Sequence, residues 1–182
     1  TFSTEAELGF LLELSGCSVL LLEKQVLKKD FTAMLAGIEP AISTAAPGQL
    51  SSTRLPFLRH IAALGGGEGE IEDWDSFLRR GDAVDPAKID ACAATVTPAD
   101  PGAVFFSSGS TAKPKGIINS HRAMALQLWR YRRYVATSDD CRAWSANGFF
   151  WSGNFTQAIG ATFTAGGCLV LQRYFDPGEA LR

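Results

Sequence analysis

The first 22 residues combine a helical pattern of hydrophobic positions with a strand-like one. Leucines at positions 8, 11, 12 and 14 share one face of a helix. Thr4 and Glu7 have the spacing of a capping box, and Gly16 is placed to end the helix. Residues 17–22 are almost continuously apolar, which predicts a buried strand directly after the helix.

The same alternation continues to residue 64. An amphipathic segment at residues 26–35 predicts a second helix that ends at Gly37. Residues 56–64 have the apolar character of a strand, although Arg59 and His60 interrupt it. Helices alternating with strands predict an α/β fold, with a mainly parallel sheet flanked by helices.

Turn-forming residues separate these elements from the rest. The run at residues 41–53 is rich in Ala, Ser, Pro and Gly and predicts a loop. Glycines at residues 65–69, with Glu68 and Glu70 among and beside them, predict a flexible connection. Later patterns predict a helix at 74–78, a helix starting at Pro86, strands at 103–106 and 116–118, a helix from Ser120 to Val135, a strand at 142–146, a further helix, and a strand at 168–172.

The segment between the predicted strands at 103–106 and 116–118 is rich in Ser, Thr, Gly and Lys, which are the residue types of a phosphate-binding loop. Its hydroxyls can donate hydrogen bonds, Gly109 allows close backbone approach, and successive N–H groups in such a turn can bind an anion. Pro114 keeps Lys113 out of the α region, so both lysines belong to extended chain. A serine-rich surface loop is the alternative interpretation. The candidate phosphate-binding residues are Ser107, Ser108, Gly109, Ser110, Thr111, Ala112, Lys113 and Lys115.

This loop does not have the spacing of the common P-loop or of a dinucleotide-binding loop. Its sequence, SSGSTAKPKG, resembles the Thr/Ser-rich signature of the adenylate-forming (AMP-binding) superfamily, which includes acyl-CoA synthetases, luciferases and peptide-synthetase adenylation domains. Ser110 replaces the usual threonine and keeps the hydroxyl. Ala112 replaces the usual glycine, so a loop that needs positive φ there would be strained.

The resemblance extends to the aromatic segment at residues 149–154, FFWSGN. In acyl-CoA synthetases a similar aromatic motif is followed by glycine, a helix and a strand, and its aromatic residue lies beside the acyl-adenylate. The resemblance therefore implies a substrate-binding segment, and an indole there would shield the adenylate from water. For Phe149 and Phe150, packing in the core is as good an interpretation as a role in the pocket. For His121, a structural hydrogen-bonding role is as good an interpretation as a functional one. The predicted substrate-binding residues are Trp151, Ser152, Gly153 and Asn154.

The resemblance also implies a reaction. A small-molecule carboxylate would attack the α-phosphate of ATP, with Mg²⁺ on the phosphates, and pyrophosphate would leave. The acyl-adenylate would then pass to coenzyme A. No covalent nucleophile is needed, and no catalytic or metal-binding residue is predicted within this sequence.

The family motifs for adenine, ribose, Mg²⁺ and the catalytic lysine have no counterpart here. We therefore expect residues 1–182 to be a partial N-terminal AMP-binding domain, truncated before those motifs and before the C-terminal lid domain. The helix start at Asp176-Pro177, close to the end of the sequence, supports that expectation. The missing C-terminal part would be its partner, and the fragment alone would be inactive.

Two alternatives have other chemistry. Ser110 and Lys113 have the Ser-x-x-Lys spacing of penicillin-recognising acyl transferases, but Pro114 opposes the helix that this motif requires. A non-catalytic binding module derived from an adenylation domain is the second alternative, and Ala112 is the main indication for it.

Composition and charge exclude several other classes of protein. A hydrophobic share of 46% and a charged share of 20% are ordinary for a globular protein, and the net charge of -2 predicts neither nucleic-acid nor general membrane binding. On that ground the arginines of the helix after Ser120 are interpreted as a solvated face. No apolar run is long enough for a transmembrane segment. The four cysteines are far apart and predict no disulfide framework, which fits the reducing environment of the cytoplasm. Together with the two histidines they also predict no metal site.

Overall fold

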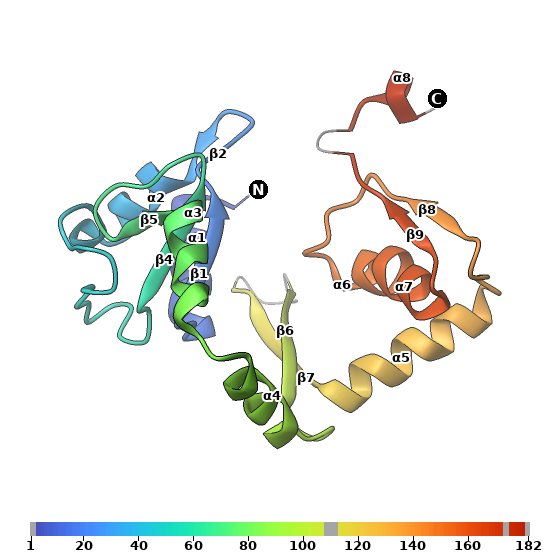
Figure 1. The fold of residues 1–182 in the computed structure, drawn as a ribbon. Coiled ribbons are helices and arrows are strands. Elements are labelled where there is room, and N and C mark those ends of the chain that lie inside the picture. The colour runs from blue at the N-terminus through green and yellow to red at the C-terminus, as the bar shows by residue number, and fades with distance from the viewer. Residues whose placement is uncertain (1–2, 108–112, 173–174, 181–182) are drawn as a thin grey trace. The chain divides into compact units, whose positions relative to one another are not determined.

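The computed structural model describes residues 3–107, 113–172 and 175–180. The chain divides into two compact units, Thr1–Ala93 and Ala94–Arg182, which are called unit 1 and unit 2 (Figure 1). Each unit has its own helices and strands, and they are described in turn.

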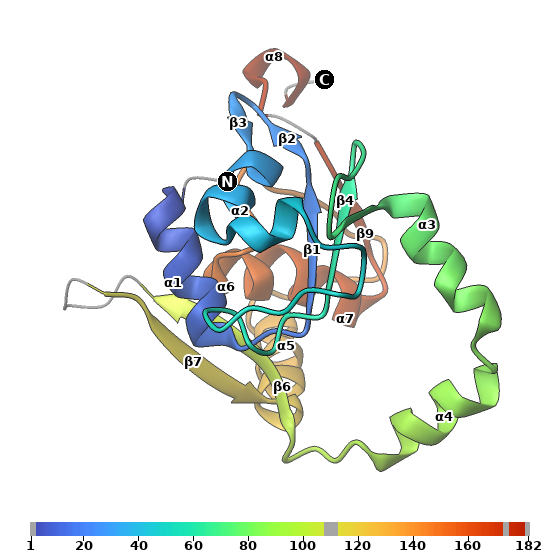
Figure 2. The ribbon, with the colours of Figure 1, turned by 90° about the vertical axis from the view of Figure 1, so that its left-hand side faces the viewer.

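Unit 1 is built on a three-stranded parallel sheet in the order β1-β4-β5. Its apolar core is formed mainly by leucine and isoleucine from the sheet, from α1, α2 and η1, and from the irregular chain before β4. Figure 2 shows α1 and α2 next to each other beside this sheet. The elements are α1 (Glu5–Ser15), β1 (Val19–Glu23), β2 (Gln25–Val26), β3 (Lys29–Asp30), α2 (Phe31–Ile38), η1 (Pro40–Ser43), β4 (His60–Leu64), β5 (Ile71–Asp73), α3 (Trp74–Arg79), η2 (Arg80–Ala83) and α4 (Pro86–Thr95), which crosses into unit 2.

Local sequence signals account for the beginning of this unit. The Thr4 hydroxyl accepts a hydrogen bond from the Glu7 N–H at 3.3 Å, and the Glu7 carboxylate accepts one from the Thr4 N–H at 2.7 Å. Gly16 ends α1 in the left-handed region at φ 57°. The capping box and the predicted first helix are confirmed.

The prediction of one helix over residues 26–35 is wrong. Val26 lies in β2, which forms a two-residue antiparallel ladder with β3. Leu27 turns the chain between them at φ 56°. The helix begins only at Phe31, because the Asp30 carboxylate accepts a hydrogen bond from the Ala33 N–H at 2.9 Å and caps it there.

Unit 2 begins with an antiparallel hairpin and continues into a long helix. Strands β6 and β7 pair along their length, and Ser120 caps α5 by accepting a hydrogen bond from the Ala123 N–H at 3.2 Å, as the sequence predicts. Its elements are β6 (Pro101–Ser107), β7 (Lys115–Ser120), α5 (His121–Tyr134), β8 (Arg142–Trp144), α6 (Ser152–Asn154), the π-helical turn η3 (Phe155–Gly160), α7 (Ala161–Ala165), β9 (Cys168–Val170) and α8 (Pro177–Ala180).

Helix α5 packs against η3 and α7, while β8 and β9 form a parallel pair. Gly160 permits the close approach of η3 to α5, since a β-carbon there would overlap the Leu128 side chain. Parallel strands with packed helices confirm the predicted α/β class; the β6–β7 hairpin is antiparallel.

Candidate functional site

The hairpin holds both ends of the predicted phosphate loop side by side. Ser107, the last residue of β6, pairs directly with Lys115, the first residue of β7. Lys113 and Lys115 are both exposed. Five of the predicted phosphate-binding residues lie outside the described part of the chain: Ser108, Gly109, Ser110, Thr111 and Ala112.

One face of the hairpin leads to the predicted substrate-binding segment. Phe105 pairs with Ile117 across the strands, and these two side chains point to the same face. The Phe105 ring lies 5.5 Å from that of Phe155, centroid to centroid, with the planes tilted by 57°. Phe155 directly follows residues 151–154. A predicted phosphate-binding element and a predicted acid-binding element are therefore joined by an aromatic contact.

A cavity of about 180 Å³ lies beside this contact. Ser152 lines it, together with residues from both strands of the hairpin and from the inner side of α5. The sequence interpretation missed these hairpin and helix residues as site residues, although alternation in β6 and i, i+4 spacing in α5 are signals for a shared inner face. The lining is Phe105, Ile117, Asn119, Ala123, Met124, Gln127, Leu128, Ser152, Phe155 and Thr156.

Asn154 is buried and fixes the shape of the aromatic loop. Its Nδ2 donates a hydrogen bond to the carbonyl of Asn147 at 2.7 Å, and its Oδ1 accepts one from the Ser145 hydroxyl at 2.7 Å. Only 3% of Asn154 is exposed. The side chain of Asn154 is thus engaged with its own loop, while its predicted role in substrate binding stays a prediction.

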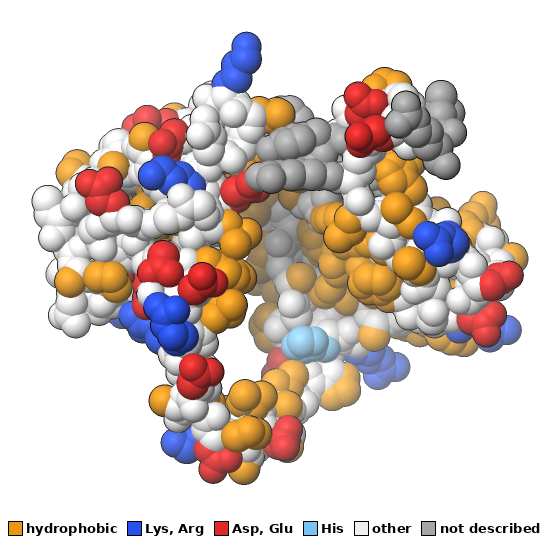
Figure 3. Space-filling model, turned by 45° about the horizontal axis from the view of Figure 1, so that its top comes forward, with side chains coloured by type: hydrophobic (Ala, Val, Ile, Leu, Met, Phe, Trp, Pro, Cys, Tyr) orange, Lys and Arg blue, Asp and Glu red, His pale blue; other side chains and the backbone are white. Residues whose placement is uncertain are grey.

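Trp151 remains accessible, with 52% of its surface exposed. A β-carbon on Gly153 would come within 2.7 Å of the Trp151 indole, so glycine makes room for that ring. Ser152 is also exposed. Figure 3 shows hydrophobic side chains gathered on the surface of unit 2, and the exposed ones near this loop include Phe149, Phe150, Trp151, Leu171 and Phe175.

A second cavity, of about 270 Å³, lies between residues 145–149 and the end of β9. Gln172 lines it and donates from Nε2 to the carboxylate of Glu179 at 3.2 Å. Its Oε1 is buried and accepts no hydrogen bond from the described residues.

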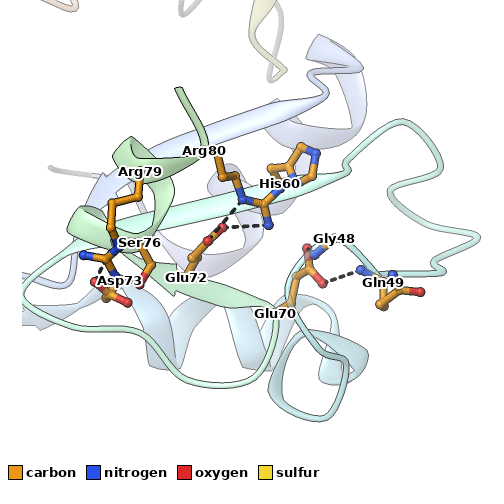
Figure 4. Close-up of polar contacts among 9 residues, drawn as sticks. All are labelled: Gly48, Gln49, His60, Glu70, Glu72, Asp73, Ser76, Arg79 and Arg80. Atoms are coloured by element: carbon orange, nitrogen blue, oxygen red, sulfur yellow. Dashed lines mark hydrogen bonds and ion pairs between the residues drawn. The ribbon is translucent and has the colours of Figure 1, made fainter. Parts of the chain in front are cut away.

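The burial of Glu70 in unit 1 corrects the prediction that residues 65–70 form a flexible connection. Glu70 belongs to no flexible connection: it is completely buried, and its carboxylate accepts hydrogen bonds from the N–H groups of Gly48 at 2.9 Å and Gln49 at 3.1 Å (Figure 4). The preceding Gly69 has φ 63°, and a β-carbon there would overlap the Ile42 carbonyl. The turn at Gly69 directs the Glu70 side chain toward the predicted loop at residues 41–53. The two hydrogen bonds of Glu70 then attach that loop to the sheet.

Arg80 links two strands of the same sheet. Its guanidinium pairs with the Glu72 carboxylate of β5 at 2.9 Å and lies 3.2 Å from Nδ1 of His60 on β4 (Figure 4). Because a guanidinium only donates, Nδ1 of His60 is the acceptor in this contact. His60 therefore has a structural partner that the sequence did not reveal.

The described residues form neither a metal-binding cluster nor a membrane-spanning helix. Within residues 3–107, 113–172 and 175–180, no three His, Cys, Asp or Glu side chains are grouped so as to hold a metal ion. In the same ranges, none of the helices combines the length and apolar character needed to span a bilayer.

Comparison with known proteins identifies the family. The model of the AMP-binding enzyme family matches residues 1–181. A 3-[(3aS,4S,7aS)-7a-methyl-1,5-dioxo-octahydro-1H-inden-4-yl]propanoyl:CoA ligase of Mycobacterium tuberculosis is 34% identical over 135 residues, covering 73% of this chain and 26% of that protein. The nonribosomal peptide synthetase dtpA of Aspergillus flavus is 32% identical over 91 residues, covering 50% of this chain and 3% of that protein.

A solved structure agrees in fold. The anthranilate CoA ligase AuaEII, in complex with anthranoyl-AMP, matches with a TM-score of 0.71 at 19% identity, over 94% of this chain and 29% of that one. The chain thus spans about a quarter of the length of the CoA ligases it matches. The resemblance noted in the loop and in the aromatic segment is confirmed: the chain belongs to the AMP-binding enzyme family.

Proposed function

We propose that this chain supplies the phosphate-binding part of an ATP-dependent carboxylate-activating ligase. The reaction would join an acid to AMP, release pyrophosphate, and then transfer the acyl group to coenzyme A. The observation that carries this proposal is the contact between Phe105 and Phe155, because it ties the strand before the phosphate loop to the segment that carries Trp151.

The chemistry of the loop suits the phosphates of ATP. Ser107 and Lys115, paired at its base, combine a hydroxyl donor with an ammonium group. Such groups are complementary to phosphate oxygens whose charge shifts during displacement. We assign the β- and γ-phosphates to the loop from Ser107 to Lys115, including Gly109, Ser110 and Thr111.

The same donors do not suit Mg²⁺, which takes oxygen ligands and commonly binds through one or two carboxylates and the substrate phosphates. The described residues provide no cluster of acidic groups for it. We therefore expect Mg²⁺ to arrive on ATP, where it would neutralise phosphate charge.

The cavity beside the hairpin would take the apolar part of the acid. Phe105, Leu128 and Phe155 supply apolar wall, and Ser152 lies at the same cavity. Trp151 would cover the carboxylate and shield the adenylate from water. Asn154 would act through the loop that it holds in place.

We further propose that residues 1–182 form the N-terminal part of an adenylation domain and that activity requires the rest of that enzyme. The chain corresponds to 26% of the length of the Mycobacterium ligase, which supports this division. All four cysteines are thiols, which suits a reducing compartment such as the cytoplasm.

Acid-dependent exchange between ATP and pyrophosphate tests the proposal. A panel of short, long and aromatic carboxylates would be assayed with this chain and with the longest protein that its reading frame encodes. We expect exchange only with the longer protein, and a loss of about a hundredfold for Lys115→Ala. Lys88→Ala, on the exposed surface of α4, is the matched control.

Two results would contradict the proposal. Exchange by this chain alone would refute the division of the domain. If the longer protein catalysed no exchange with any of the acids, the proposed ligase function would be refuted. ATP binding, measured by tryptophan fluorescence, would then show whether the chain is a binding module.

A further inference from the structure

Helix α5 has two faces with different surroundings. Met124, Leu128 and Tyr131 are partly buried on the side that packs against η3 and α7. On the opposite side, five exposed residues follow the spacing of one helix face. At 3.6 residues per turn they fall within an arc of about 100°. This outer face consists of Arg122, Leu126, Trp129, Arg130 and Arg133.

The outer face is arranged as more than a solvated surface. The guanidinium of Arg133 lies over the ring of Trp129, 4.9 Å from its centroid. Trp129 and Leu126 nevertheless stay 46% and 37% exposed. A cation stacked on an indole holds a large flat side chain in place, which lowers the entropy that a partner must overcome on binding.

The charge of this face has no counterpart in its own helix. Helix α5 contains no Asp or Glu. The ion pairs of Arg54 with Glu13 and of Arg80 with Glu72 both lie in unit 1, and neither includes an arginine of this face. Residues 94–182 hold nine Lys and Arg against five Asp and Glu, whereas residues 1–93 hold eight against fourteen. The net charge of -2 is therefore the sum of an acidic first half and a basic second half of the chain.

The kind of anionic partner follows from where the apolar residues lie. A membrane-surface helix inserts a continuous apolar face, but α5 uses that face internally. Three arginines also fall short of the clusters of about four to eight that read as anionic-lipid sites. Tryptophan and arginine are, in contrast, the residues most enriched at protein–protein hot spots.

We propose that the outer face of α5 binds an acidic helical segment of another protein. Carboxylates of that segment would pair with Arg122, Arg130 and Arg133. An apolar side chain between them would pack on Leu126 and on the Trp129 indole. This docking surface is independent of adenylation, because its residues do not line the cavity or the phosphate loop.

The test uses a fluorescently labelled helical peptide of about 20 residues, long enough to be helical in water. Its glutamates have the spacing of Arg122, Arg130 and Arg133, and a leucine lies between them. We expect saturable binding to this chain by fluorescence anisotropy that weakens at high salt. The R130E/R133E variant should bind at least about tenfold more weakly.

Charge exchange provides the decisive control. A matched peptide with lysines in place of the glutamates should bind the R130E/R133E variant and not the original chain. Trp129→Ala should weaken binding of the acidic peptide without changing its salt dependence. Absence of saturable binding, or equal binding of a glutamine peptide, would overturn the proposal. So would tighter binding of phosphatidylserine-containing vesicles or of single-stranded oligothymidine than of the acidic peptide.

Discussion

The ring of Phe105 packs against the ring of Phe155, with centroids 5.5 Å apart and planes tilted by 57°. Phe105 belongs to the strand that enters the predicted phosphate loop, and Phe155 follows the segment that contains Trp151. They lie 50 positions apart in the sequence. This contact is the physical link between the two parts of the proposed active site.

We predict that the two rings stabilise unit 2 cooperatively. Tilted aromatic pairs contribute about 0.5–1.5 kcal/mol beyond area burial, so a double-mutant cycle of Phe105→Leu and Phe155→Leu should give a coupling free energy in that range. Denaturant unfolding followed by tryptophan fluorescence measures it. Strictly additive effects would show that the rings only fill space.

Asn154 should matter for the order of the aromatic loop. Asn154→Ala removes both hydrogen bonds of a buried amide, to the Asn147 carbonyl and from the Ser145 hydroxyl, at a cost of about 0.5–1.5 kcal/mol each. Trp151 emission should also shift as the loop loosens. Gln157→Ala, an exposed position in η3, is the control and should leave both unchanged. A stable Asn154→Ala variant with native emission would contradict this role.

Glu70 should protect two particular amides. In Glu70→Gln the side chain has one acceptor oxygen for two N–H donors, so we expect hydrogen exchange at Gly48 and Gln49 to accelerate and stability to fall by about 1.5–3 kcal/mol. Glu68→Gln is the matched control, because Glu68 is exposed. Equal exchange rates in the two variants would refute the anchoring of the loop.

The helix caps should make stability depend on acid pH. Hydrogen bonds from the Ala33 N–H and the Thr32 hydroxyl lower the pKa of Asp30, and hydrogen bonds from Ser76 lower the pKa of Asp73. A lowered pKa in the folded state stabilises the fold fully above the unfolded pKa, and this stabilisation is lost as the pH falls through the folded pKa.

The measurement is the stability difference between the original chain and Asp30→Asn or Asp73→Asn at several pH values. We expect it to be constant near neutral pH and to shrink as the pH falls below about 4, the usual range of an aspartate. Asp90→Asn, exposed on α4, controls for a general charge effect. A difference that grows toward low pH would contradict the sign of the pKa shifts.

Local signals were the reliable part of the sequence interpretation. The capping box of Thr4 and Glu7, the end of α1 at Gly16 and the cap of α5 at Ser120 were all predicted, because each depends on residues within one helical turn. The interpretation of residues 26–35 was wrong because it did not use such a local capping signal. Hydrophobic period alone placed the helix start, whereas the Asp30 cap decides it.

The sequence by itself determined the family and the α/β class, since these depend on residue types at fixed spacing. Tertiary structure alone decided that Glu70 is buried against Gly48 and Gln49, and that Phe105 meets Phe155. Each of those pairs joins residues more than 20 positions apart. Such contacts depend on how the packed elements bring distant segments together, which no local pattern of polar and apolar residues encodes.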